Sequence, residues 1–278
     1  MDSLMPTEMA QKAEEVGIAK AKMGLSKTLV LSILAGAFIA FGAVFSTTAT
    51  AGSIMSYGMT RVLGGLTFSL GLVLVIVGGA ELFTGNNLIV MAWANKKVST
   101  QLLLRNWLLV YVGNMIGALS IAVLIFLSQQ YMFGKGAVLI NVMNIALSKC
   151  QTGFIPGITL GILCNILVCL AVWLCFSAKT VTGKILSIIF PITAFVACGF
   201  EHCIANMYFV PLGMLIKLYG GEKADAVIEA NGVNYDAINI PDFITNNLIP
   251  VTIGNMIGGA VLVGMVYWFV FLRKQKAR

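Results

Sequence analysis

Six long runs with almost no charged residues divide this chain of 278 residues. A helix needs roughly 20 apolar residues to cross a hydrocarbon core of about 30 Å, and each run is longer than that. Because 59% of the residues are hydrophobic and only 10% are charged, the chain is too apolar for one water-soluble core. We therefore predict an all-α polytopic membrane protein whose six crossings lie in residues 28–60, 62–95, 106–134, 150–178, 185–216 and 243–272.

The second and fifth runs are too long for straight crossings, since each would extend about 50 Å as a continuous helix. Near the middle of each run the same pattern occurs, Gly-x-Glu-x4-Asn, as GAELFTGN in residues 79–86 and GFEHCIAN in residues 199–206. We predict that both helices are broken at these glycines. The residues expected to support the breaks are Gly79, Glu81, Asn86, Gly199 and Asn206.

A second repeated pattern divides the chain into two halves. Asn106 precedes the segment GNMIG at 113–117 by seven residues, and Asn247 precedes the same segment at 254–258 by seven residues. With three crossings in each half, the second half enters from the opposite side, which predicts a 3+3 inverted repeat with its pathway near the midplane. The GxxxG spacing indicates close helix packing, with Asn114 and Asn255 as hydrogen-bonding residues between helices. The first and fourth crossings share too little sequence to be aligned.

The distribution of Lys and Arg predicts the orientation. Thirteen of them lie on the side of the two termini and five on the other, so both termini are expected to be cytoplasmic. The expected parts are an amphipathic helix within segment 1–27 that lies in the membrane interface, a channel domain 28–272 and a basic tail 273–278. Its two repeats would cover about 28–134 and 150–272. The net charge of +7 follows from this bias, and no nucleic-acid partner is expected.

The candidate site is His202, the single histidine of the chain, beside Glu201 in the fifth crossing. An ionisable residue within a membrane marks a functional site by default, and histidine changes charge in the physiological pH range. The starts of the resumed half-helices would favour an anion. We expect Glu81 and Glu201 to cap those half-helices or to bond loosened amides rather than to transfer protons. For Thr84, a structural and a functional role are equally open.

Other classes of function have less support. The six cysteines form no CxxC pair and most lie in apolar runs, so we expect no disulfide framework, metal site or cofactor, and little chemistry for an enzyme. A pore for neutral solutes, similar to an aquaporin, stays open because the inverted-repeat design is shared. Such pores usually carry Asn-Pro-Ala at their half-helix ends, and neither break here contains proline.

Taken together, four segments resemble the formate/nitrite transporter family, and within it the formate channels. They are residues 79–85 (GAELFTG), 165–173 (NILVCLAVW), 199–207 (GFEHCIANM) and 247–255 (NLIPVTIGN). The resemblance implies a homopentamer of aquaporin-like subunits in the bacterial inner membrane, each with its own pore for small monovalent anions such as formate, nitrite or hydrosulfide.

By this resemblance His202 is the central pore histidine and Thr84 its hydroxyl partner. Lys149 corresponds to a lysine that attracts anions, with Asn165 and Glu201 supporting the site. The N-terminal helix corresponds to a pH-sensitive gate. Apolar constrictions above and below the histidine are implied at Phe68, Leu72, Leu82, Phe83 and Phe195.

One departure from the family pattern concerns the residues after Lys149. Formate channels commonly carry histidines there, whereas this chain continues with Cys150, Gln151 and Thr152. Formate is the expected substrate, and a hydrosulfide or nitrite channel stays open. The expected mechanism is passive or proton-coupled passage, in which apolar rings remove water from the anion and His202 donates a hydrogen bond or proton.

Overall fold

The computed structural model describes residues 3–273, and that part of the chain is helical without a strand. The elements of its first part, in chain order, are α1 (Pro6–Lys22), α2 (Leu25–Thr50), α3 (Tyr57–Gly78), α4 (Phe83–Asn86), the 3-10 turn η1 (Asn87–Ile89), α5 (Val90–Ala94) and α6 (Thr100–Ser128).

The second part begins with a short 3-10 turn and ends in one long helix. Its elements are η2 (Gln130–Met132), α7 (Ala137–Cys150), α8 (Phe154–Ser177), α9 (Val181–Ala197), α10 (Cys203–Tyr219), α11 (Glu222–Asn231), α12 (Ile240–Asp242), η3 (Phe243–Leu248), α13 (Ile249–Met256), η4 (Ile257–Met265) and η5 (Trp268–Leu272). The segments α12 to η5 form the continuous final helix, with π-helical stretches at η3, η4 and η5. Of the predicted basic tail, residues 274–278 lie outside the described residues.

Five helices of the described part are long and apolar enough to cross a membrane: α2, α3, α6, α8 and the final helix Ile240–Leu272. The predicted fifth crossing is instead divided into α9 and α10, of 17 residues each. The predicted second crossing is divided as well, because α3 ends at Gly78 and the chain resumes a helix at Phe83 in α4. The two predicted breaks are therefore present in the fold.

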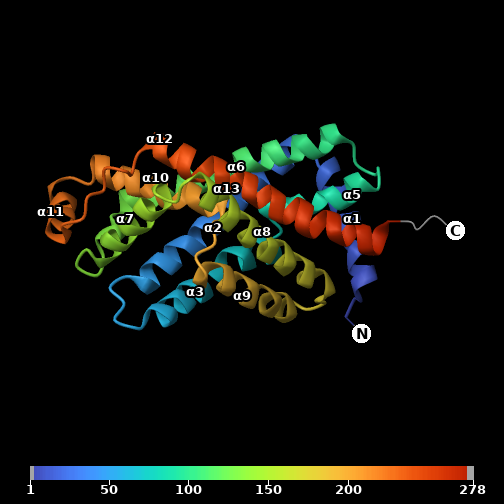
Figure 1. Cartoon of the computed structure of the whole chain (residues 1–278), viewed down its shortest axis with the longest axis horizontal. Coiled ribbons are helices and arrows are strands. Elements are labelled where there is room, and N and C mark those ends of the chain that lie inside the picture. Colours follow the sequence, from blue (N-terminus) through green and yellow to red (C-terminus); the bar gives the residue numbers. More distant parts are fainter. Residues whose placement is uncertain (1–2, 274–278) are drawn as a thin grey trace.

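The helices run between two ends of the molecule, and Figure 1 shows α1 and α5 at one end and α7 and α11 at the other. We call these the α1 end and the α7 end. Packing follows a repeated scheme, in which α2 contacts α3 and α6 while α8 contacts α9 and the final helix. The halves meet where α3 packs against α9. The first parts of the two broken helices therefore contact each other at the boundary between the halves.

Glycines let the helices of each half approach closely, as the GxxxG spacing predicts. A Cβ atom at Gly117 would overlap the carbonyl oxygen of Ile33 on α2, and one at Gly258 would overlap the carbonyl oxygen of Ile162 on α8. Only a residue without a side chain fits at either contact.

Helix α1 differs from its sequence-based prediction in one respect. Its charged residues were expected to lie mostly away from the apolar face, and Glu14 is instead buried where α1 packs on α5, η1, α8 and η5. Asn95 and Lys97 bind the two oxygens of Glu14 at 2.5 and 2.6 Å, so the buried charge is paired. The helical period alone did not reveal these partners, because they come from the connection between α5 and α6.

Candidate functional site

Both breaks are made by a glycine in the left-handed region of backbone space. Gly79 has φ of 77° and Gly199 has φ of 76°, conformations that a side chain disfavours. After each glycine the next amide turns back to a carbonyl five residues earlier, Ala80 to Val75 and Phe200 to Phe195. The following residues place a glutamate, Glu81 or Glu201, at the middle of the break.

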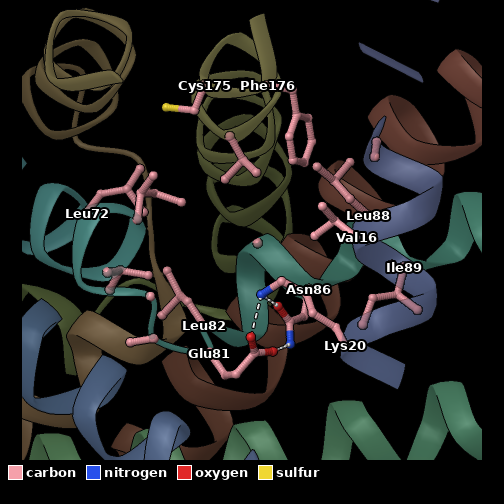
Figure 2. Close-up of a pocket in the computed structure, with 18 of the residues that line it drawn as sticks. Val16, Lys20, Leu72, Glu81, Leu82, Asn86, Leu88, Ile89, Cys175 and Phe176 are labelled. Carbon is pink, nitrogen blue, oxygen red and sulfur yellow. Dashed lines mark hydrogen bonds and ion pairs between the residues drawn. The ribbon is translucent and has the colours of Figure 1, made fainter. Parts of the chain in front are cut away.

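At the first break, Glu81 accepts hydrogen bonds from Lys20 Nζ at 2.7 Å and from Asn86 Nδ2 at 2.8 Å. Lys20 also donates to Asn86 Oδ1 at 3.0 Å, and Asn86 Nδ2 reaches Asn106 Oδ1 at 3.0 Å. Figure 2 shows Lys20, Glu81 and Asn86 joined in this way beside Leu82. Lys20 comes from α1, so the N-terminal helix supplies part of the site.

At the second break, the same residue types meet in the same order. Lys149 Nζ binds both carboxylate oxygens of Glu201, at 3.1 and 3.0 Å. Asn206 Nδ2 donates to Glu201 Oε2 at 2.7 Å and to Asn247 Oδ1 at 2.6 Å. Glu201 is thereby held in a buried ion pair supported by amide groups.

Asn114 and Asn255 tie each break to its own half, as predicted. Asn114 donates to the carbonyls of Ser32 and Glu81 and accepts from the amide of Phe83, with distances of 2.8, 2.9 and 2.9 Å. Asn255 does the same with Gly161, Glu201 and Cys203, at 2.8, 2.9 and 3.0 Å. One backbone amide at the start of each half-helix, that of Phe83 or Cys203, is therefore bound by an asparagine. Among the described residues no backbone amide donates to Glu81 or Glu201, so the expected capping by these side chains does not occur.

Two backbone hydrogen bonds at the breaks align the first and fourth crossings, which the sequence left unaligned. The amide of Glu81 donates to Leu31 and that of Glu201 donates to Leu160, two acceptors 129 positions apart in the chain. Lys20 and Lys149 are separated by the same interval. Lys20 therefore occupies the place in the first half that Lys149 occupies in the second. Sequence reasoning missed Lys20 because the segment that carries it has no shared motif.

His202 caps the start of α10 and bonds Thr84 across the two halves. The amide of Ala205 donates to His202 Nδ1 at 3.2 Å, and His202 Nε2 lies 2.9 Å from the Thr84 hydroxyl. Since Nδ1 accepts, a neutral imidazole carries its hydrogen on Nε2 and donates it to Thr84. Both side chains are buried. The hydroxyl hydrogen of Thr84 has no acceptor among the described residues and is available to a third group.

Two cavities approach this pair from opposite ends. The α1-side cavity, of about 410 Å³, is lined by residues that include Lys20, Leu72, Glu81 and Leu82. Figure 2 shows Leu72 and Leu82 in its wall. The α7-side cavity, of about 350 Å³, is lined by further residues of the site: Phe68, Lys149, Phe195, Gly199, Glu201, His202 and Asn206. On α3, Phe68 and Leu72 are four positions apart, or about 6 Å along a helix, so the barrier between the cavities is about one turn thick.

Most of the predicted apolar constrictions lie at this barrier. The rings of Phe68 and Phe195 meet edge to face with centroids 5.7 Å apart, and Phe195 stacks on the imidazole of His202 at 6.0 Å. Phe83 lies differently, since its ring packs on Tyr111 at 5.0 Å and it is not among the described residues that line either cavity.

Asn165 supports the site from α8 without contacting His202. Its Nδ2 donates to Asn87 Oδ1 at 2.8 Å and to the carbonyl of Asn255 at 2.7 Å, and it lies 3.3 Å from the carbonyl oxygen of Thr84. Asn165 thus connects the loop of the first half that carries Thr84 to the final helix of the second half.

This chain is similar to known membrane transporters over nearly its whole length. The profile of the formate/nitrite transporter family matches residues 7–269. The chain belongs to this family. It is 44% identical to the formate channel FocA of Escherichia coli strain K12 over 274 residues, covering 98% of this chain and 96% of that relative. It is 40% identical to FocA of Haemophilus influenzae over 264 residues, covering 95% and 93%.

A solved structure agrees with the sequence comparison. The fold superimposes on a pentameric formate channel with formate bound at a TM-score of 0.83 and 45% identity, covering 90% of this chain and 98% of that one. The predicted family and the all-α membrane fold are therefore confirmed. Members of this family transport solutes, so the protein is a membrane transporter and not an enzyme.

Proposed function

We propose that the protein passes formate across the bacterial inner membrane as a homopentamer with one pathway in each subunit. The relatives described as formate channels support the substrate, and the solved pentameric channel supports the assembly. The surplus of Lys and Arg on the side of the termini supports a cytoplasmic α1 end. Nitrite and hydrosulfide are the alternative substrates within the family.

The observation that carries this proposal is the hydrogen bond between Thr84 and His202 at the barrier between the two cavities. A bare anion that crosses a dry barrier loses its hydration at a cost of several kcal/mol. His202 Nε2 and the Thr84 hydroxyl each carry a polar hydrogen, and both groups lie beside the apolar rings. An anion that replaces their mutual bond receives hydrogen bonds in place of water.

Proton coupling is the finer part of the mechanism. An imidazole with a hydrogen on both ring nitrogens could give one proton to formate and let it cross as the neutral acid. Giving up the hydrogen of Nε2 while Nδ1 still accepts from Ala205 would leave an imidazolate, so this transfer requires a second proton on the ring. That proton reaches the ring only when the cap on α10 opens.

Each cavity brings a lysine close to the path of the anion before it reaches the barrier. Lys20 and Lys149 lie at equivalent places on the two sides, each held by a glutamate, and Asn165 keeps the loop that carries Thr84 in position. Helix α1 lines the α1-side cavity through Lys12, Val16 and Lys20, so its displacement would change access to the pathway. This placement supports the expected role of α1 as a gate.

The test is flux into proteoliposomes that contain the purified protein, with formate, nitrite and hydrosulfide compared at two pH values. We expect formate to be the best of the three. The variant His202→Phe should reduce formate flux roughly ten-fold or more, the effect of losing a hydrogen bond to a charged group. Unchanged flux and unchanged pH dependence would remove His202 from the mechanism.

Two controls complete this test. Phe190→Leu alters an exposed apolar residue on the same helix as Phe195, and it should keep wild-type flux. Swelling of the vesicles in glycerol, compared with sodium formate, separates the anion pathway from a pore for neutral solutes. Rapid swelling in glycerol without formate flux would contradict the proposed function.

A further inference from the structure

The α7-side cavity contains one cation that no motif had indicated. Its charged lining residues are Lys149, Glu201 and Arg61. Lys149 is bound to both oxygens of Glu201, so these two charges balance each other. Among the described residues, no carboxylate lies within ion-pair distance of Arg61. Arg61 therefore gives the lining of this cavity its net positive charge.

Arg61 is fixed at the end of the broken fifth crossing. It lies in the second turn of α3, and its guanidinium donates to the carbonyl of Ala197 through Nε at 3.2 Å and to the carbonyl of Val196 through Nη2. These carbonyls belong to the last turn of α9, which ends two residues before Gly199. The arginine thus joins the start of one broken crossing to the break of the other.

The end of α9 would disfavour an anion without this arginine. The carbonyls at the end of a helix carry a partial negative charge, which cations stabilise, and Val196 belongs to this end although its carbonyl also accepts from the amide of Gly199. Val196, Gly199 and Phe200 line the α7-side cavity, so this negative end lies on the path to His202. Arg61 neutralises it.

The guanidinium of Arg61 has N–H donors that its two carbonyl acceptors do not use. Arginine carries five N–H groups in a planar fork, and two of them are used by Ala197 and Val196. The remaining groups have no acceptor among the described residues, and Arg61 is only half-buried in the cavity wall. Such a fork matches the two coplanar oxygens of a carboxylate. An ion with one binding atom gains the charge of the arginine but not its second hydrogen bond.

We propose that Arg61 is a binding site for planar anions with two oxygens, and that it selects formate and nitrite over hydrosulfide at the α7-side mouth. The site rests on the proposed function, because it acts on anions that then pass His202. It adds a specificity determinant at a position distinct from the histidine barrier. At the α1 side the cation without a carboxylate partner among the described residues is Lys184, a point charge without such a fork.

The test is sided electrophysiology in planar bilayers, with each anion added to one side at a time. Arg61→Lys keeps the charge and loses the fork. We expect it to raise the half-saturation concentration for formate and nitrite from the α7 side roughly ten-fold, and to leave hydrosulfide unchanged. Arg61→Gln should raise the value for all three anions. Half-saturation from the α1 side should stay at the wild-type value in both variants.

Two results would overturn the proposal. If Arg61→Lys behaves as the wild type with every anion, charge alone suffices and the fork has no role. If it shifts all three anions equally from both sides, Arg61 only stabilises the break. A wild-type protein that conducts no formate would instead refute the proposed function, which keeps the two failures apart.

A second measurement uses the unmodified protein and does not depend on the folding of a variant. Phenylglyoxal reacts with accessible arginines, and mass spectrometry reports the adduct at Arg61. Formate and nitrite should protect Arg61, whereas hydrosulfide at the same concentration should not. Equal modification with and without formate would also overturn the proposal.

Discussion

At the α1 end, Lys20 donates to both Glu81 and Asn86, with bonds of 2.7 and 3.0 Å. At the α7 end, both side-chain hydrogen bonds of Lys149 go to Glu201. Asn206 Oδ1 is consequently buried without a hydrogen-bond partner among the described residues. The lysines also differ in exposure, 26% for the side chain of Lys20 and 12% for that of Lys149. Equivalent residues therefore make a looser site at one end and a tighter one at the other.

The origin of the two lysines explains this difference. Lys20 is carried by α1, whose equivalent in the second half is α7, the helix that carries Lys149. Helix α1 is attached through the buried, paired Glu14, while α7 buries the apolar Met143 at the equivalent position. The two equivalent helices are therefore attached differently, α1 by a buried ion pair and α7 by an apolar side chain.

The largest expected effect comes from the glutamates. Glu201→Gln should lower the free energy of unfolding by about 3–5 kcal/mol, because it leaves the charge of Lys149 buried without a counterion. Glu81→Gln should cost about half of that, since Lys20 is more exposed and keeps its bond to Asn86. Unfolding in SDS measures both losses. Equal losses would mean that the two sites are equally tight.

The close helix contacts should respond alike in the two halves. Gly117→Ala and Gly258→Ala each force a Cβ against a backbone carbonyl, and each should cost about 3 kcal/mol, the upper end for overpacking. Gly58→Ala is the control, since a Cβ there meets nothing within 4 Å, and it should change stability by less than about 1 kcal/mol. A large loss in only one half would break the equivalence of the packing.

The two asparagine clamps should also be equivalent. Asn114→Ala and Asn255→Ala each leave a buried backbone amide without its acceptor, at a cost of about 1–3 kcal/mol in unfolding free energy. Ser120→Ala, at an exposed position on α6, should stay within about 0.5 kcal/mol. Thermal unfolding of the purified protein measures the series. A negligible effect at either asparagine would show that another group binds the freed amide.

The smallest effects concern the attachment of α1. Lys97→Gln removes the ion pair with Glu14 and should lower the free energy of local unfolding of α1 by about 1 kcal/mol at most, because the side chain of Lys97 is 52% exposed. Lys12→Gln removes an exposed pair with Glu15 at 3.4 Å and should change stability by less than about 0.5 kcal/mol. Hydrogen exchange in α1 measures both. Faster exchange with Lys12→Gln than with Lys97→Gln would reverse the assigned order.

Much of the site was predictable because its residues recur at fixed spacing. The pattern around Gly79 and Gly199 predicted the breaks, and the repeated GNMIG segments predicted the clamps by Asn114 and Asn255. Three features were not predictable. Lys20 and Arg61 are separated in sequence from the groups they bind, and the segments that align α2 with α8, LSIL at 31–34 and LGIL at 160–163, are too short and too apolar to stand out without the contacts they make.

The sequence by itself determined the membrane, the interrupted crossings and the position of the single histidine, since apolar length, glycine spacing and one intramembrane imidazole are local properties. Only the tertiary structure decided which groups meet. It brought Thr84 to His202 across the two halves, gave Glu14 its partners and set Arg61 against the end of α9. The physical reason is that partners for buried polar groups are chosen by how the helices pack, and that packing depends on the whole chain.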